Sequence, residues 1–249
     1  MSRPVCLITG GSRGIGAATA RLAAERGYDI LLNYVSDEAS ADSVARECRA
    51  LGARVETVRG DMGAEADITA LFAALDERFG RLDALVNNAG ITGRAGRLDE
   101  TPTETIRRCI DINVTGAILV AREAVLRMST RHGRSGGAIV HVSSMATTLG
   151  APGEYVWYAA SKGAIDSLTI GMARELATEG VRVNAVSPGL IETDIHATGG
   201  QPDRLERLAP MIPMKRPGTA DEVAQTILFL LSDAASYVDG ANLRVSGAR

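Results

Sequence analysis

Residues 9–16 read TGGSRGIG, and they come directly after the short apolar run PVCLIT that begins at Pro4. Glycines let a backbone pass close to a ligand, and the start of a helix carries unpaired N–H groups that attract phosphate. Between a strand and a helix, such a loop favours binding of the pyrophosphate of a dinucleotide. The stretch lacks the GxxxxGK[ST] pattern, which disfavours a P-loop nucleotidase.

The remainder of the chain alternates short apolar runs with longer segments of helical periodicity, which is the pattern of repeated βα units. Runs such as ALVN and AIVHV are apolar on both faces, as is typical of parallel strands covered by helices. The pattern predicts an α/β fold with a doubly wound, Rossmann-type parallel sheet of seven strands and helices on both faces. The predicted strands are residues 4–9, 29–34, 54–58, 83–87, 138–143, 182–187 and 242–245. The predicted helices are residues 15–26, 38–51, 65–79, 103–130, 155–178 and 220–232.

A single domain over residues 1–249 is predicted, because no Pro/Ser-rich linker and no change of composition divides the chain. One segment breaks the βα rhythm. Between Ile191 and Gly218, prolines and glycines surround only a short helical pattern at 203–209. Long irregular insertions in compact α/β domains are usually lids or binding loops, so residues 191–215 are predicted to form a substrate-binding loop.

The composition limits the partners of the protein. The formal net charge is -3 and aromatic residues make up 4%, which disfavours nucleic acid or an anionic membrane as a partner. Three scattered cysteines fit neither a disulfide framework nor zinc, and no metal site is expected. Because the first apolar run starts at Pro4, with no room for a signal peptide before it, a cytoplasmic location is expected.

Several short motifs occur in order, each at the end of a predicted strand. After TGGSRGIG come the pair Asp61–Met62, NNAG at 87–90, Ser143–Ser144 and SPG at 187–189. Together with Tyr158 and Lys162, this set resembles the short-chain dehydrogenase/reductase family over essentially the whole chain. The resemblance implies a nicotinamide dinucleotide bound by Gly10, Ser12, Arg13, Gly14, Ile15, Gly16, Asn33, Tyr34, Asp61, Met62, Asn88, Ala89, Gly90, Tyr158, Lys162, Pro188, Gly189, Ile191 and Thr193.

The end of the second predicted strand decides between the two nicotinamide cofactors. An acid there would accept hydrogen bonds from the ribose 2′-OH and would repel a 2′-phosphate. Tyr34 occupies this position, and Arg13 in the glycine loop supplies a cation suited to phosphate. NADP(H) is therefore favoured, with Asn33 and Ser36 as further contacts, while Asp37 a few residues on keeps NAD(H) possible.

Tyr158 and Lys162 are four residues apart in a long helical pattern, which makes them neighbours on one helix face. A phenol titrates at about 10, and a nearby ammonium favours the phenolate and lowers that pKa. By resemblance, Tyr158 exchanges the proton and Lys162 binds the nicotinamide ribose. The resemblance also makes Ser144 the group that orients the substrate oxygen, and Asn113 a member of a proton relay. Trp157 stands where the family usually has a smaller residue, so it is expected to reshape the substrate pocket.

The sequence thus predicts an NADP(H)-dependent oxidoreductase that interconverts a carbonyl and a secondary alcohol. By resemblance the substrates are those of 3-oxoacyl-carrier-protein reductases or of sugar and polyol dehydrogenases, and shared motifs do not separate the two. A third alternative is a protein that keeps the fold but only senses the cofactor. Such a protein would lack Tyr158 or Lys162, and both residues are present in this chain. The resemblance also implies a homotetramer in which the predicted helices 103–130 and 155–178 pair between subunits.

Overall fold

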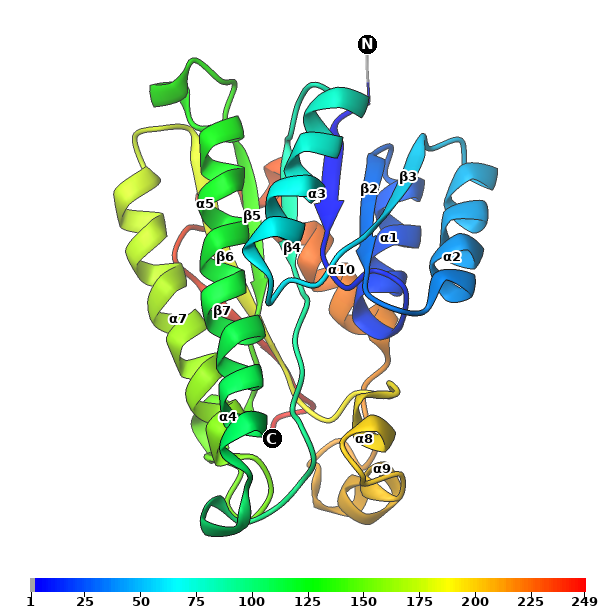
Figure 1. Cartoon of the computed structure of the whole chain (residues 1–249), viewed down its shortest axis with the longest axis vertical. Helices are drawn as coiled ribbons and strands as arrows, with labels where there is room; N and C mark the ends of the chain where they lie inside the picture. The colour runs from blue at the N-terminus through cyan, green and yellow to red at the C-terminus, as the bar shows by residue number, and fades with distance from the viewer. Residues whose placement is uncertain (1–2) are drawn as a thin grey trace.

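A parallel β-sheet forms the centre of the computed structural model, which describes residues 3–249 (Figure 1). Its seven strands are β1 Val5–Ile8, β2 Asp29–Tyr34, β3 Val55–Arg59, β4 Ala84–Asn87, β5 Gly137–Val142, β6 Val181–Pro188 and β7 Asn242–Val245. Each lies within one residue of its predicted bounds, which confirms the predicted fold class.

The strand order is β3-β2-β1-β4-β5-β6-β7, and every neighbouring pair is parallel. The chain moves outward in one direction from β1 to β3, then returns to the other side of β1 with β4. In such a sheet the loops after β1 and β4 diverge, and a crevice opens at the carboxyl ends of these two strands. In Figure 1 this edge of the sheet faces the lower end of the molecule.

Helices cover both faces of the sheet (Figure 1). Eight are α1 Gly14–Glu25, α2 Glu38–Ala50, α3 Glu65–Arg78, α4 Thr103–Ile110, α5 Ala117–Met128, α7 Val156–Leu176, α9 Arg204–Leu208 and α10 Ala220–Leu231. The shorter turns are η1 Leu98–Glu100, η2 Asp111–Gly116, η3 Thr130–His132, α6 Ala146–Leu149, α8 Ile195–Thr198, η4 Ala209–Met211 and η5 Asp233–Ala235.

Two apolar cores hold these layers together. One lies between the sheet and α1, α2 and α10, and the other between the sheet and α3, α5 and α7. Alanines fill most of the buried face of α1, so this helix lies close against the strands. α10 begins with a capping box in which Thr219 and Glu222 bond each other's backbone N–H groups. The packing therefore fixes the helix starts that surround the crevice.

The predicted helix 103–130 is interrupted in the structure. α4 ends at Ile110, a π-helical turn covers Asp111–Gly116, and α5 begins at Ala117. The turn is wider than an α-helical turn, and such π-turns are frequent at functional sites. It brings Asn113 beneath the loop that follows β4, where the side chain bonds Ile91.

The predicted substrate-binding loop carries more structure than its prolines and glycines suggest. It contains α8, α9 and η4, and a small apolar core of Leu190, Leu208 and Ile212 holds it together. Figure 1 places α8 and α9 at the edge of the sheet where the crevice opens. Over residues 3–249, the helices are too short or too polar for any of them to cross a membrane.

Candidate active site

A cavity of about 890 Å³ runs from the glycine loop after β1 to the start of α7. It lies at the carboxyl ends of β1, β4, β5 and β6, where the strand order predicts a ligand crevice. The structure brings most of the predicted site residues together in its wall. These are Gly10, Ser12, Arg13, Gly14, Ile15, Tyr34, Asp61, Met62, Asn88, Ala89, Gly90, Ser144, Tyr158, Lys162, Pro188, Gly189, Ile191 and Thr193.

The glycine loop has the shape that a pyrophosphate requires. Gly10 and Gly14 adopt φ angles of +62° and +53°, a left-handed conformation that favours glycine. Within residues 3–249, Arg13 is the N-cap residue of α1 and makes no side-chain capping hydrogen bond, and the first turn holds no acid. Backbone N–H groups and the positive end of the helix therefore face the cavity, so the loop fits a phosphate group.

Two predicted cofactor contacts lie behind the loop instead of in the cavity wall. Asn33 is fully buried, accepts a hydrogen bond from Gly10 N at 3.2 Å and donates to Gly60 O at 2.9 Å. A Cβ atom on Gly16 would lie 2.3 Å from Gly10 O, so this glycine allows the loop to fold against α1. Neither residue lines the cavity, because Asn33 and Gly16 shape the loop from behind, and direct contact of either with the cofactor stays a prediction.

Arg13 and Asp37 face each other at the end of the cavity next to β2. The Arg13 Nε atom lies 3.8 Å from Asp37 Oδ2, and both side chains stay partly exposed. Asp37 also caps α2, because it accepts hydrogen bonds from Ser40 N at 3.0 Å and Ser40 Oγ at 2.8 Å. These bonds, the backbone one foremost, hold the pKa of Asp37 below its usual range. Its oxygens are thus already engaged, whereas among the described residues the Arg13 guanidinium has one long contact, with Asp37.

Asp61 and Met62 form the wall of the cavity after β3, where the resemblance implied a contact with the dinucleotide. The Asp61 carboxylate accepts from Gly63 N at 2.8 Å and forms an ion pair with Arg108 of α4. Sequence reasoning missed Arg108, although it lies one helical turn before Ile112, another residue of the cavity wall. The ion pair closes this side of the crevice.

The NNAG segment joins the glycine loop to β4. Asn88 Nδ2 donates to Thr9 O at 2.9 Å and to Gly10 O at 3.0 Å. Thr9 Oγ1 in turn accepts from the backbone N–H groups of Asn88 and Ala89, each at 3.0 Å. These four bonds fix the two loops of the crevice relative to each other, so Asn88 both lines the cavity and braces it.

Tyr158 and Lys162 lie one turn apart at the start of α7, as predicted. The Lys162 Nζ atom is 5.8 Å from the centre of the Tyr158 ring and donates to Val142 O at 2.7 Å. Burial lowers the pKa of Lys162 to about 8. Burial also raises the pKa of Tyr158 to about 12, and a hydrogen bond with Ser144 opposes this shift. The expected lowering of the Tyr158 pKa is thus wrong, because loss of water around the phenol dominates.

The two serines after β5 point in different directions. Ser143 is buried and donates to Asp166 Oδ1 at 2.5 Å, whereas Ser144 lines the cavity. The Ser144 Oγ atom accepts from Ala146 N at 3.0 Å, which fixes it at the start of α6. Its hydrogen bond with Tyr158 places both hydroxyl groups at one spot in the cavity. A substrate oxygen there can contact both groups.

Asn113 does not line the cavity but lies directly behind it. Its Oδ1 accepts from Ile91 N at 2.9 Å, and its Nδ2 donates to Ile91 O at 2.8 Å and to Ser161 Oγ at 3.0 Å. A Cβ atom on Gly90 would lie within 3.2 Å of Asn113 Oδ1 and 3.3 Å of Lys162 Nζ. Asn113 therefore lies close to the Lys162 ammonium, in agreement with the expected role of Asn113 in a proton relay.

The segment after β6 closes the cavity opposite Tyr158. Met145 N donates to Pro188 O at 2.9 Å, and a Cβ atom on Gly189 would meet Ser246 at 2.8 Å. Ile191 and Thr193 follow in the cavity wall. Here too the predicted residues lie together, on the side of the crevice where the substrate-binding loop begins.

A charged cluster at the cavity mouth was not predicted from the sequence. Arg204 of α9 donates to Glu154 Oε2 at 2.5 Å, and its guanidinium lies 5.2 Å from the Tyr155 ring. Arg207 approaches the same carboxylate at 3.5 Å. Trp157 does not line the cavity; it is buried beside Tyr155 and donates to Thr92 O at 2.7 Å. Spacing along the sequence gives no signal for contacts between segments about 50 residues apart.

Comparisons with known proteins agree with this geometry. A family model described as Enoyl-(Acyl carrier protein) reductase matches residues 10–247. The uncharacterized oxidoreductase YgfF of Escherichia coli (strain K12) is 49% identical over 98% of this chain and 99% of its own. The cis-4-hydroxycyclohexanecarboxylate dehydrogenase of Sinomonas cyclohexanicum is 42% identical over 98% of this chain and 95% of its own.

Two solved structures overlay closely on the whole chain. A short chain dehydrogenase from Burkholderia cenocepacia J2315 in complex with NADP gives a TM-score of 0.90, with 32% identity over 98% of this chain and 96% of its own. The 3-ketoacyl-(acyl-carrier-protein) reductase from Brucella melitensis complexed with NADH also gives 0.90, with 32% identity over 99% and 98%. The chain therefore belongs to the short-chain dehydrogenase/reductase family and is an oxidoreductase that acts on carbonyl and hydroxyl groups.

Proposed function

We propose that this protein is an NADP(H)-dependent reductase of 3-oxoacyl-type carbonyl compounds, which also catalyses the reverse oxidation of the secondary alcohol. The observation that supports this most strongly is the meeting of Ser144, Tyr158 and Lys162 in one cavity with the glycine loop. These residues combine a proton donor, a group that orients the carbonyl and a buried cation. A protein that only senses the cofactor has no need of this combination.

In the reductive direction, a bound nicotinamide supplies the hydride that forms the new C–H bond. Ser144 donates a hydrogen bond to the carbonyl oxygen and holds the carbonyl in place. Tyr158 transfers its phenolic proton to that oxygen as negative charge develops on it, so the carbonyl becomes an alcohol. Lys162 stabilises the resulting phenolate, and Asn113 with water returns a proton to Tyr158.

The direction of the two pKa shifts suits reduction. A pKa of about 12 keeps Tyr158 protonated at neutral pH, so it is ready to donate. An alkoxide is a stronger base than a phenolate, and the transfer to the substrate oxygen is therefore downhill. Lys162 titrates at about 8, so its ammonium form predominates at neutral pH and declines above that value. Reduction is expected to slow as the pH rises through this range.

Arg13 supports the choice of NADP(H). Its guanidinium is partly exposed at the end of the cavity beside Tyr34 and Ser36, where a 2′-phosphate would lie. Asp37 is the group that would favour NAD(H), but its carboxylate is occupied as the cap of α2. Of the related structures, one holds NADP and another NADH, so NAD(H) remains the alternative cofactor.

The apolar wall beyond Ser144 supports an acyl substrate over a polyol. This wall contains Ala146, Leu149, Ala151, Pro152, Leu190, Ile195 and Leu208. Methylene groups of an acyl chain would bury apolar area against these side chains, whereas the hydroxyl groups of a sugar would lose hydrogen bonds to water. A sugar or polyol dehydrogenase of the same family is the alternative that a substrate panel tests.

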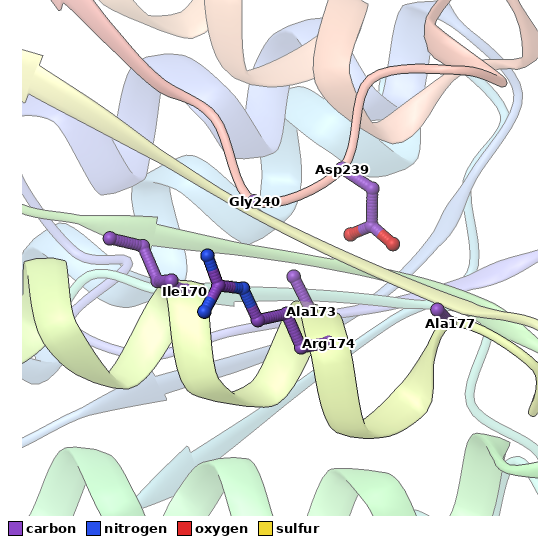
Figure 2. Close-up of a pocket in the computed structure, with 6 residues that line it drawn as sticks. All are labelled: Ile170, Ala173, Arg174, Ala177, Asp239 and Gly240. Atoms are coloured by element: carbon purple, nitrogen blue, oxygen red, sulfur yellow. The ribbon is translucent and has the colours of Figure 1, made fainter.

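A homotetramer in the cytoplasm completes the proposal. α5 exposes Ile118 and Leu126, and α7 exposes Ile170, each more than 40% accessible. A shallow groove of about 410 Å³ lies beside Ile170, between α7 and the loop at Asp239 (Figure 2). Exposed apolar side chains on neighbouring helices support association with further copies of the chain.

The test is a substrate panel with NADPH and NADH that covers acetoacetyl thioesters, sugars, polyols and small diketones. We expect turnover of the acetoacetyl thioesters, with NADPH preferred. Tyr158→Phe should lower kcat at least about 100-fold while NADPH affinity stays within about threefold, since only the acid is lost. Tyr237→Phe, which alters a fully exposed tyrosine, serves as control. Activity of Tyr158→Phe within a few-fold of wild type would contradict the assigned acid.

A further inference from the structure

Asp166 lies one turn beyond Lys162 on α7 and connects three parts of the fold. Its Oδ1 atom accepts a hydrogen bond from Ser143 Oγ at 2.5 Å and another from Asn242 Nδ2 at 2.8 Å. Ser143 directly follows β5 and Asn242 begins β7. One carboxylate oxygen therefore joins α7 to the carboxyl end of β5 and to the start of β7.

These bonds affect the position of Ser144. Ser143 directly precedes Ser144, and successive side chains of extended backbone point to opposite sides. While Ser143 is held on α7 by Asp166, and also contacts Lys162 O at 3.4 Å, the next side chain points into the cavity. Asp166 thus fixes where Ser144 lies relative to Tyr158, since α7 carries both Asp166 and Tyr158.

The charge of Asp166 also acts on Lys162. Burial makes the ammonium costly, and the neighbouring carboxylate opposes that effect. The other titratable groups near Lys162 are Cys109 from α4, Tyr158 on the same helix and His141 from β5. At neutral pH burial keeps all three uncharged, because it raises the pKa values of Cys109 and Tyr158 and lowers that of His141. Among these neighbours of Lys162, Asp166 is the residue that carries a formal negative charge.

We propose that Asp166 is a positioning residue that holds Ser143 and Ser144 against α7 and places a carboxylate one helical turn from Lys162. The proposal rests on the assigned roles of Tyr158 and Lys162. It adds a residue that does not touch substrate or cofactor but sets the geometry and protonation state of those that do.

The lysine content of the chain allows a direct test. Lys162 and Lys215 are its two lysines, so a protein labelled with ¹³C-lysine gives two side-chain signals, and Lys215→Arg assigns them. Asp166→Asn keeps an oxygen that can accept from Ser143 and removes the charge. We expect the titration midpoint of Lys162 to fall by about one pH unit in this variant. Glu175→Gln, which removes an exposed carboxylate farther along α7, should leave the midpoint unchanged.

Turnover measurements separate the electrostatic effect of Asp166 on Lys162 from its hydrogen bond to Ser143. Asp166→Asn should move the alkaline limb of the pH profile of kcat to lower pH, with KM for NADPH within about twofold. Ser143→Ala keeps the charge and removes the hydrogen bond, so it should lower kcat about tenfold without moving that limb. An unchanged Lys162 midpoint in Asp166→Asn would overturn the electrostatic role, and an unchanged kcat in Ser143→Ala would overturn the positioning role. The NMR titration needs no substrate, so it stays informative even if the proposed reaction is wrong.

Discussion

Arg13 stands at the start of α1 with its guanidinium 3.8 Å from Asp37, in a partly exposed position at the edge of the cavity. A charge-assisted contact of this kind contributes about 1.5–3 kcal/mol. Arg13→Ala should therefore raise the Kd for NADPH about 10- to 100-fold and leave the Kd for NADH within about threefold. Fluorescence titration of both cofactors measures the two values.

A matched variant makes the Arg13 result specific. Asp37→Asn removes the ion pair while its side-chain oxygen can still cap α2, so it should not weaken NADPH binding. If Arg13→Ala weakened both cofactors equally, recognition of the 2′-phosphate by this residue would be ruled out.

His141 links the stability of the fold to pH. The side chain is buried in β5, and within residues 3–249 neither ring nitrogen has a hydrogen-bond partner. Burial lowers its pKa from 6.5 to about 4, so the unfolded chain binds a proton before the folded chain does. The stability that His141 contributes is complete above pH 6.5 and declines as the pH falls toward 4. The shift corresponds to about 3 kcal/mol.

Replacement of His141 should flatten this dependence. We expect urea unfolding of His141→Leu to lose about 3 kcal/mol less than wild type between pH 7 and pH 4. His132→Gln, at an exposed histidine, should follow the wild-type curve. Equal slopes for wild type and His141→Leu would show that His141 does not govern this part of the acid response.

The residues that carry the chemistry could be predicted from the sequence, because their spacing has a local meaning. Tyr158 and Lys162 meet since four residues make one helical turn. The burial of Asn33 was not predicted, for the opposite reason: its partners Gly10 and Gly60 come from other loops, and burial of its side chain has no signature in the sequence.

At the scale of elements, local patterns located the strands but not the break in the helix 103–130. Apolar periodicity continues through α4, η2 and α5, so it gives no sign of the π-turn. The turn depends on tertiary contacts: Asn113 pairs with Ile91, and Gly116 approaches Met62 O so closely that a Cβ atom would lie 1.8 Å away. Contacts between distant segments fix such a turn, and a single sequence does not reveal them.

The predicted substrate-binding loop is joined to the segment before α7 by Glu154. Its carboxylate accepts from Arg204 at 2.5 Å and approaches Arg207 at 3.5 Å, and the Arg204 side chain is only 13% exposed. Glu154→Gln should loosen the loop, raise KM for the carbonyl substrate about three- to tenfold and speed tryptic cleavage within 191–215. Steady-state kinetics and timed proteolysis measure both effects.

Glu206 provides the comparison for Glu154. It is an exposed carboxylate on α9 in the same loop, and Glu206→Gln should change neither KM nor the rate of cleavage. Should Glu154→Gln behave like Glu206→Gln, the ion pair would have no part in holding the loop closed.

At the scale of the whole molecule, the position of the site follows from topology. Seven parallel strands in the order β3-β2-β1-β4-β5-β6-β7 place the crevice between β1 and β4, and the predicted motifs all lie at that edge. The shape of the cavity beyond Ser144, by contrast, does not follow from the strand order. It depends on how α8, α9 and the segment before α7 pack, as the contact between Arg204 and Tyr155 illustrates. That packing was beyond the reach of periodicity and motif spacing.

The exposed face of α7 is part of the proposed interface between subunits. Ile170 is 46% accessible beside the groove formed with Arg174, Asp239 and Gly240 (Figure 2). A glutamate at this position would place a charge where a second copy is expected to bury apolar area, which is strongly unfavourable unless the charge is paired. In the proposed tetramer α5 and α7 both face further copies of the chain, so Ile170→Glu should weaken their association. Light scattering should then give a mass below that of four 26.1 kDa chains. Leu51→Glu, at an exposed leucine after α2, should keep the wild-type mass, and a tetramer in both variants would exclude the α7 face as an interface.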